Sequence, residues 1–260
     1  MHSTDRPAGP AREPYFNVPG VIVATLALLL SVHLVRELIL PTLQDVRFLR
    51  LFAFIPARYD TSLVPGGAYP GGAYAEIWTF FTYSLIHGDF VHLGANTIWL
   101  LPFGTAIARR FGPLRYLAFF AVTAACAAAV HLATHAGEDI PMVGASGAIS
   151  AMMAASMRFV FQPGAPLGLF RTEDDQSYRA RALPLGAAFR DLRVVVFIAV
   201  WFGLNTLIGL GSISIAGEQS VAWQAHIGGF LGGLLLFAVF DPVSRHARDR
   251  SRADAGPTLH

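Results

Sequence analysis

The stretch AWQAHIGGFLGGLLLFAVF, residues 222–240, contains no Asp, Glu, Lys or Arg and is long enough to cross a lipid bilayer as one helix. Its single imidazole, His226, shares a helical face with Gly229 and Gly233. A Gly-x-x-x-Gly pair lets a second helix approach to backbone contact. We therefore expect a membrane helix that holds a histidine against a closely packed neighbour.

The whole chain has the composition of a membrane protein. Its 260 residues are 54% hydrophobic and only 14% charged, and the mean hydropathy is +0.50. A formal net charge of +2 is too small to indicate a nucleic-acid partner. The single cysteine, Cys126, excludes a disulfide framework and a CxxC metal site, and we expect no cofactor.

Six apolar segments are predicted to cross the bilayer, so the expected fold class is all-α, a polytopic membrane bundle. The ranges are 18–38, 88–108, 114–134, 145–161, 193–210 and 222–240. The first is interpreted as a transmembrane helix and not as a signal peptide, because Arg36-Glu37 follows its long apolar core where a cleavage site would stand. These spans form one membrane domain, 18–240, between polar tails at 1–17 and 241–260 that are expected to be disordered.

Arginine supplies all 19 Lys+Arg residues, and its distribution predicts the orientation. With both termini in the cytoplasm, fifteen of the 19 arginines fall on the inner side. The other four, Arg36, Arg47, Arg50 and Arg58, fall in the first outer loop. Both termini are therefore predicted to be cytoplasmic.

Two loops are long. The first outer loop, about 39–87, mixes apolar patches with Gly-Pro turns, and an interfacial element and an ordinary surface loop both remain possible. Its aromatic residues Trp78, Phe80, Phe81 and Tyr83 suit the interface. The inner loop, about 162–188, is interpreted as a solvated connector because it contains prolines and the acidic cluster 173–175.

Polar residues of catalytic type occur in three of the spans. Ser146 follows Gly144-Ala145 where the fourth span is expected to begin as a helix, so the serine would lie at a helix N-terminus with free amides beside it. His92 and Asn96 are one helical turn apart and point the same way, as donors to an oxyanion would.

Helix packing is the better explanation of Ser146 and of the pair His92 and Asn96 when each is taken alone, and it also accounts for His226. Gly147 begins a small-residue face, and His92, Asn96 and His226 could join helices by hydrogen bonds. Packing does not predict the whole set, in which a hydroxyl, an imidazole and a pair of donors come from three spans. The complete set favours a nucleophile, a general base and an oxyanion site.

With these motifs the chain closely resembles the rhomboid intramembrane serine proteases, in their basic six-span bacterial form. The resemblance covers roughly residues 76–240 and rests on three motifs. They are His87-x4-His92-x3-Asn96, Gly-x-Ser-Gly at 144–147, and Ala-His-x-x-Gly-x-x-x-Gly at 225–233.

The resemblance implies Ser146 as the nucleophile and His226 as the general base and acid. It also implies that His92, Asn96, the Ser146 amide and the Gly144 backbone form the oxyanion hole. The nearest acidic residues are expected to be Glu138, Asp139 and Glu218 in the outer loops, so we expect a catalytic dyad without a third member. The loop 211–221 is expected to cover the site.

Two positions differ from the family pattern. Thr79 follows Trp78 where the family has a Trp-Arg pair, and Ser150 stands where many members have a tyrosine one turn after the nucleophile. Without that ring, Trp201 or Met153 is expected to hold His226.

The implied activity is cleavage of single-span transmembrane proteins, after small residues and near the outer face of the bacterial inner membrane. The oligomeric state is left open. Two alternatives remain: an inactive relative that binds client spans without cutting them, and a transporter lined by histidines. The histidines of the second alternative are His87, His92, His131, His135 and His226.

Overall fold

Helices are the dominant element of the part of the chain that the structure describes. The structure is a computed structural model that describes residues 18–60, 62, 69–167, 175–209 and 222–243. Its helices are α1 (Gly20–Leu38), α2 (Thr42–Phe52), α3 (Gly72–Thr82), α4 (Phe90–Phe111), α5 (Pro113–Thr134), α6 (Ser146–Ser156), α7 (Leu185–Ala188), α8 (Leu192–Gly209) and α9 (Trp223–Phe240). The predicted all-α class is confirmed. The two polar tails and the loop 211–221 lie outside the described residues, except for positions 241–243.

Each predicted span contains a helix, but the helices differ in length. Four of them, α1, α4, α5 and α9, are long and apolar enough to cross a bilayer, whereas the part of α8 that counts as an apolar helix, Leu192–Leu207, is shorter. The 11 residues of α6 extend only about 16 Å, against a hydrocarbon core of about 30 Å. The chain is thus an all-helical membrane protein in which α6 does not span by itself.

The end of α6 differs from the prediction, which continued the helix to residue 161. The regular helix ends at Ser156. Beyond it the Arg158 and Phe159 N–H groups donate three residues back, to Ala155 O and Ser156 O, and the chain then pairs with the inner loop. Leu183 N donates to Arg158 O at 2.8 Å, and Arg158 Nε donates to Leu183 O at 2.9 Å. In a continued helix the Arg158 carbonyl would accept from the N–H of Gln162. Here it accepts from the N–H of Leu183 instead.

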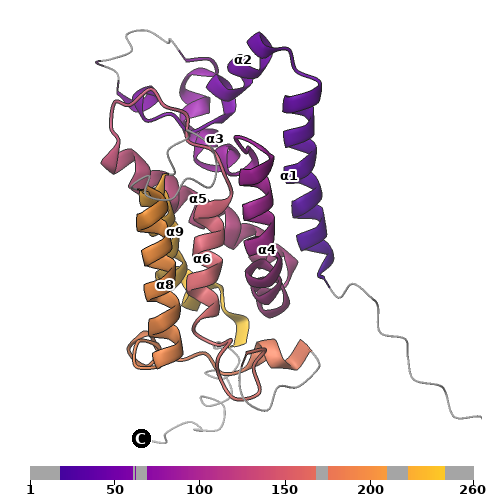
Figure 1. Cartoon of the computed structure of the whole chain (residues 1–260), viewed down its shortest axis with the longest axis vertical. Coiled ribbons are helices and arrows are strands. Elements are labelled where there is room, and N and C mark those ends of the chain that lie inside the picture. The colour runs from indigo at the N-terminus through magenta and orange to yellow at the C-terminus, as the bar shows by residue number, and fades with distance from the viewer. Residues whose placement is uncertain (1–17, 61, 63–68, 168–174, 210–221, 244–260) are drawn as a thin grey trace, which may run out of the picture.

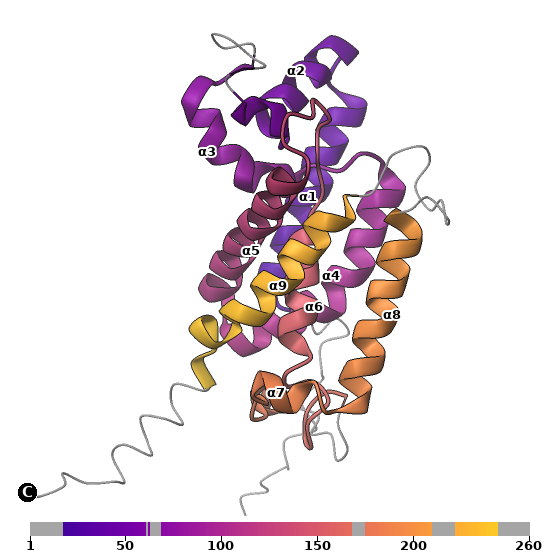
Figure 2. The same ribbon diagram turned by 90° about the vertical axis from the view of Figure 1, so that its left-hand side faces the viewer.

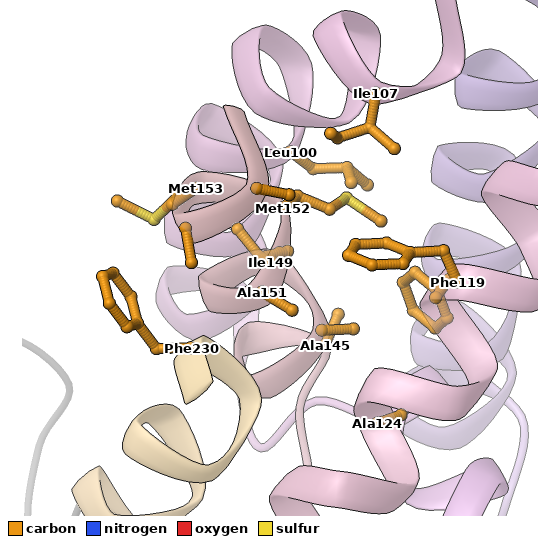
Figure 3. Packing of buried hydrophobic residues seen from close by; sticks show 14 of the residues in the cluster. Leu100, Ile107, Phe119, Ala124, Ala145, Ile149, Ala151, Met152, Met153 and Phe230 are labelled. Carbon is orange, nitrogen blue, oxygen red and sulfur yellow. The ribbon is translucent and has the colours of Figure 1, made fainter. Parts of the chain in front are cut away.

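The short helix α6 lies inside the bundle, with α4, α5 and α9 around it (Figures 1 and 2). Every α6 residue after Ser146 is buried. Figure 3 shows Met152 of α6 near Leu100 of α4 and Phe119 of α5, all three almost completely buried. Because α6 is enclosed by protein, its length does not have to match the thickness of the bilayer.

Glycines on α9 allow its backbone to touch the backbone of α6. A Cβ added at Gly229 would overlap the carbonyl group of Gly147, and one added at Gly233 would overlap the backbone of Ala151. A Cβ at Gly147 would in turn lie 2.5 Å from the Cβ of Ala127 on α5. The small residues therefore set the distance between the two helices that carry Ser146 and His226.

The first outer loop is largely helical. It folds into α2, α3 and two 3-10 turns at the end of the bundle opposite α7 (Figures 1 and 2). Trp78 Nε1 donates to Leu51 O at 3.0 Å, and Thr82 Oγ1 donates to Phe52 O at 2.6 Å, so α3 is fastened to α2. Thr79, which replaces the arginine of the family pattern, is fully buried against the Tyr59 hydroxyl at 2.8 Å.

Contacts with later segments attach this loop to the membrane helices. Phe54 and Met142 form an isolated antiparallel bridge. Tyr69 donates its hydroxyl to Asp139 at 2.5 Å, and burial, followed by this hydrogen bond, raises the pKa of Tyr69 to about 12. Tyr83, which we assigned to an interfacial aromatic group, is only 2% exposed and belongs to the core instead. The interfacial position of the other aromatic residues stays a prediction.

A buried ion pair joins α4 to the end of α9 at the α7 end of the bundle. Arg110 donates to both carboxylate oxygens of Asp241 at 3.0 Å, and both side chains are fully buried. The same guanidinium donates to the carbonyls of Tyr178 and Ala180 at 2.7 and 2.8 Å. It also lies over the ring of Phe159 at 4.4 Å. The inner loop is thereby held to the membrane helices.

Replacing Arg110 with methionine is expected to lower the free energy of unfolding by about 3–5 kcal/mol, because Asp241 stays buried but loses the guanidinium that binds both of its carboxylate oxygens. The double variant Arg110→Met/Asp241→Leu should recover most of the loss. Thermal unfolding of the purified protein in detergent measures both effects. Arg193→Met, which removes an exposed ion pair with Asp191, is the matched control and should change little. Wild-type stability in Arg110→Met would contradict the prediction.

Candidate active site

Ser146 and His226 are hydrogen-bonded to each other although 80 positions separate them in the chain. The distance between Ser146 Oγ and His226 Nε2 is 2.7 Å. Ser146 is the first residue of α6, and His226 lies in the first turn of α9. The glycine contacts between these helices bring the hydroxyl and the imidazole together.

The segment before Ser146 is held in place by backbone hydrogen bonds. Gly144 has a φ of +122°, a conformation that favours glycine, and its N–H donates to Tyr83 O at 3.0 Å. The Tyr83 hydroxyl donates to Ala124 O of α5 at 2.9 Å. The nucleophile candidate thus follows a turn that is fixed to two other parts of the bundle.

His92 lies beside this turn. A Cβ added at Gly144 would be 2.7 Å from His92 Nε2 and 3.6 Å from Ser146 Oγ, so the missing side chain leaves room for the imidazole next to the serine. His92 is in the first turn of α4, where its N–H donates to the N-cap residue Asp89 at 2.7 Å. Three helix N-termini, those of α4, α6 and α9, therefore meet at one point, and each favours negative charge there.

Asn96 follows His92 by one turn and is buried. Its Nδ2 donates to His92 O at 2.9 Å, which uses one of its two N–H groups. The Gly144 N–H is already engaged by Tyr83, so the closest candidate donors to an oxyanion are His92, the second N–H of Asn96 and the unpaired helix-start amide of Ser146.

A cavity of about 340 Å³ contains these groups. Its walls come from α4, α6, α8, α9 and the segment 141–144, and they are mainly apolar. The polar side chains in the walls include Asp89, His92, Asn96, Ser146, Asn205 and His226, together with Tyr83 and Ser150. A cavity of this size in a low-dielectric surrounding strengthens every hydrogen bond to a developing charge.

Asn205 of α8 is the site residue that the sequence analysis missed. Its Oδ1 lies 2.5 Å from His226 Nδ1. Trp201 and Met153, which were expected to hold the imidazole, also line the cavity, but the hydrogen bond comes from Asn205. The sequence contained one signal for Asn205. Its side-chain amide stands in the otherwise apolar stretch 194–205 and needs a hydrogen-bond partner there, as the side chains of Ser146 and His226 do.

The other histidines of the transporter alternative, His87, His131 and His135, do not line the cavity. His131 and His135 stack on each other at 4.2 Å near the end of α5, and His87 lies against His92 with ring centroids 5.1 Å apart. Within the described residues, no three His, Cys, Asp or Glu side chains gather as metal ligands would. Ser150 donates to Ser146 O at 2.8 Å and leaves no ring beneath His226.

Comparison with known families agrees with the motifs. The model of the Rhomboid domain matches residues 74–242, a range that includes every residue described in this site. Comparison with curated proteins finds no match. Since the family match extends over more than half of the 260 residues, the chain belongs to the rhomboid family.

Proposed function

We propose that the protein is an intramembrane serine endopeptidase that cleaves transmembrane segments. The observation that carries the proposal is the 2.7 Å hydrogen bond between Ser146 Oγ and His226 Nε2, inside a cavity that also contains His92 and Asn96. A serine is a weak nucleophile at its ordinary pKa and needs such a base. Helix packing alone gives no reason for these four side chains to share one cavity.

The reaction follows from this geometry. Ser146 Oγ attacks the carbonyl carbon of the scissile peptide bond while His226 Nε2 accepts the hydroxyl proton. His92, Asn96 and the Ser146 amide donate to the oxyanion that forms, and Gly144 makes room for His92. The protonated His226 then gives its proton to the leaving amine, which produces an ester on Ser146. Water, deprotonated by His226, attacks this ester; the C–O bond to Ser146 breaks, His226 returns the proton to Ser146 Oγ, and the new acid is released.

The proposed substrates are single-span membrane proteins. Peptide bonds in a regular helix are internally paired and shielded, so residues with weak helix propensity near the cut should favour cleavage. The helices α4, α6 and α9 begin near α2 and α3, whereas α1 begins and α9 ends at the opposite end (Figures 1 and 2). With the arginine distribution, this supports cytoplasmic termini and an outward-facing site. The family resemblance adds the bacterial inner membrane to the proposal, with six membrane segments of which α6 is enclosed by the others.

Cleavage of a transmembrane reporter by the purified protein in detergent tests the proposal. The wild type should cut the reporter, and a fluorophosphonate should label it on Ser146 by displacement of fluoride. Ser146→Ala should lose both reactions, whereas Ser156→Ala, a change to a buried serine at the far end of α6, should keep them. A metal chelator should have no effect. Cleavage that survives in Ser146→Ala, or a wild type that neither cuts nor labels, would overturn the proposal.

A further inference from the structure

The side chain of Asn205 has no role in the mechanism above, yet it contacts the general base. It lies on α8, one turn after Trp201, and is partly buried in the wall of the cavity. A polar amide in an apolar membrane helix is costly to desolvate unless both of its ends are hydrogen-bonded. Both ends are bonded here, to two different groups.

These two bonds determine which way the amide points. Asn205 Nδ2 donates to Trp201 O at 2.9 Å, and a backbone carbonyl can only accept. The oxygen Oδ1 must therefore be the atom that faces His226 Nδ1 at 2.5 Å. An amide oxygen is only an acceptor, so His226 Nδ1 is the donor and carries the imidazole proton.

The position of that proton decides whether His226 can act as a base. In a neutral imidazole with the proton on Nδ1, Nε2 has a lone pair, and Nε2 is the atom 2.7 Å from Ser146 Oγ. We propose that Asn205 is a positioning residue that fixes the tautomer and the ring orientation of His226, so that the site is a Ser146–His226–Asn205 triad. The inference rests on the proposed protease function and adds a third member to the expected dyad.

An asparagine suits this place better than the aspartate of many soluble serine proteases. A carboxylate within an apolar helix would pay a large desolvation cost, whereas an amide is neutral. The weakness of an amide is that it can turn its NH2 group toward the histidine and impose the wrong tautomer. The Trp201 carbonyl prevents this rotation, and the Trp201 ring stacks on Phe230 of α9 at 4.5 Å, which keeps α8 beside His226.

The test compares Asn205→Ala and Asn205→Leu with the wild type in steady-state cleavage of the reporter. Loss of the tautomer control should lower kcat by about 10- to 100-fold, because general-base catalysis contributes about 100- to 10,000-fold and His226 itself remains. KM should stay within about threefold. The rate of fluorophosphonate labelling of Ser146 should fall in parallel with kcat, since the same base activates the serine.

Rescue and control variants separate positioning from a structural role. Asn205→Asp should recover most of the lost kcat, because a neutral carboxyl group can accept from His226 Nδ1 and donate to Trp201 O. Thr206→Ala changes the adjacent, exposed residue and should retain wild-type kcat and KM. Thermal unfolding of each variant shows whether the bundle is intact.

Three results would overturn the inference. They are a kcat of Asn205→Leu within twofold of the wild type, a loss that falls on KM alone, and an aspartate variant no faster than the leucine variant. If neither the alanine nor the leucine variant yields folded protein, Asn205 is a structural residue and the inference also fails. A wild-type protein that neither cleaves nor labels would instead refute the proposed protease function.

Discussion

The double variant Ser146→Ala/His226→Ala is expected to be no slower than Ser146→Ala alone. Each single change should lower kcat by roughly a million-fold. Removing either the nucleophile or the base of a serine protease lowers kcat by about this factor, because the two groups act as one unit. The reason is the shared proton: the 2.7 Å bond between Ser146 Oγ and His226 Nε2 has no catalytic use once either partner is gone. Single-turnover cleavage of the reporter, with enzyme in excess, measures all three variants.

A second histidine variant tests whether the loss of activity is specific to His226. His135→Ala removes an imidazole that stacks on His131 and does not line the cavity. Cleavage should therefore be unchanged in this variant. Independent losses that multiply in the double variant would show that Ser146 and His226 do not act as one unit. A loss equally large in His135→Ala would point to a general effect of removing histidines, as the transporter alternative requires.

Local spacing was sufficient to predict the elements that carry the site. His92 and Asn96 at i and i+4, and His226, Gly229 and Gly233 at i, i+3 and i+7, identified helical faces from the sequence alone. The start of a helix at Ser146 was predicted from the Gly144-Ala145 pair that precedes it. These signals come from residues close together in the chain, where the geometry of the helix determines which side chains share a face.

Asn205 could not be identified in this way, because its partner His226 is 21 residues away on another helix. Periodicity shows which face of a helix is polar but not which neighbour that face meets. The end of α6 before residue 161 also involves a distant partner, because the N–H of Leu183, 25 positions further on, donates to the Arg158 carbonyl. The aromatic sequence around Tyr83 is typical of a membrane interface. The Tyr83 hydroxyl nevertheless donates to Ala124 O of α5, and the side chain lies in the core.

The other large effect is expected from a single methyl group at the contact between α6 and α9. Gly229→Ala should lower the free energy of unfolding by about 1–3 kcal/mol or more, because the new Cβ would lie only 2.6 Å from the Gly147 carbonyl carbon. The Cβ is fixed by the α9 backbone and the carbonyl belongs to the α6 backbone, so no rotamer change relieves the contact and α6 and α9 must separate. Thermal unfolding and reporter cleavage of the same preparation measure the consequences.

Activity should fall further than stability suggests, since Gly147 directly follows the proposed nucleophile. A displacement of about 1 Å at this point can cost about 100-fold in rate, so cleavage by Gly229→Ala should drop at least that far even where the protein remains folded. Gly203→Ala is the matched control: it introduces the same methyl group into α8, where no atom lies within 4 Å. There the greater helix propensity of alanine should raise stability by up to about 1 kcal/mol. Opposite signs for one substitution in two helices would locate the effect in the α6–α9 contact, whereas equal changes would refute it.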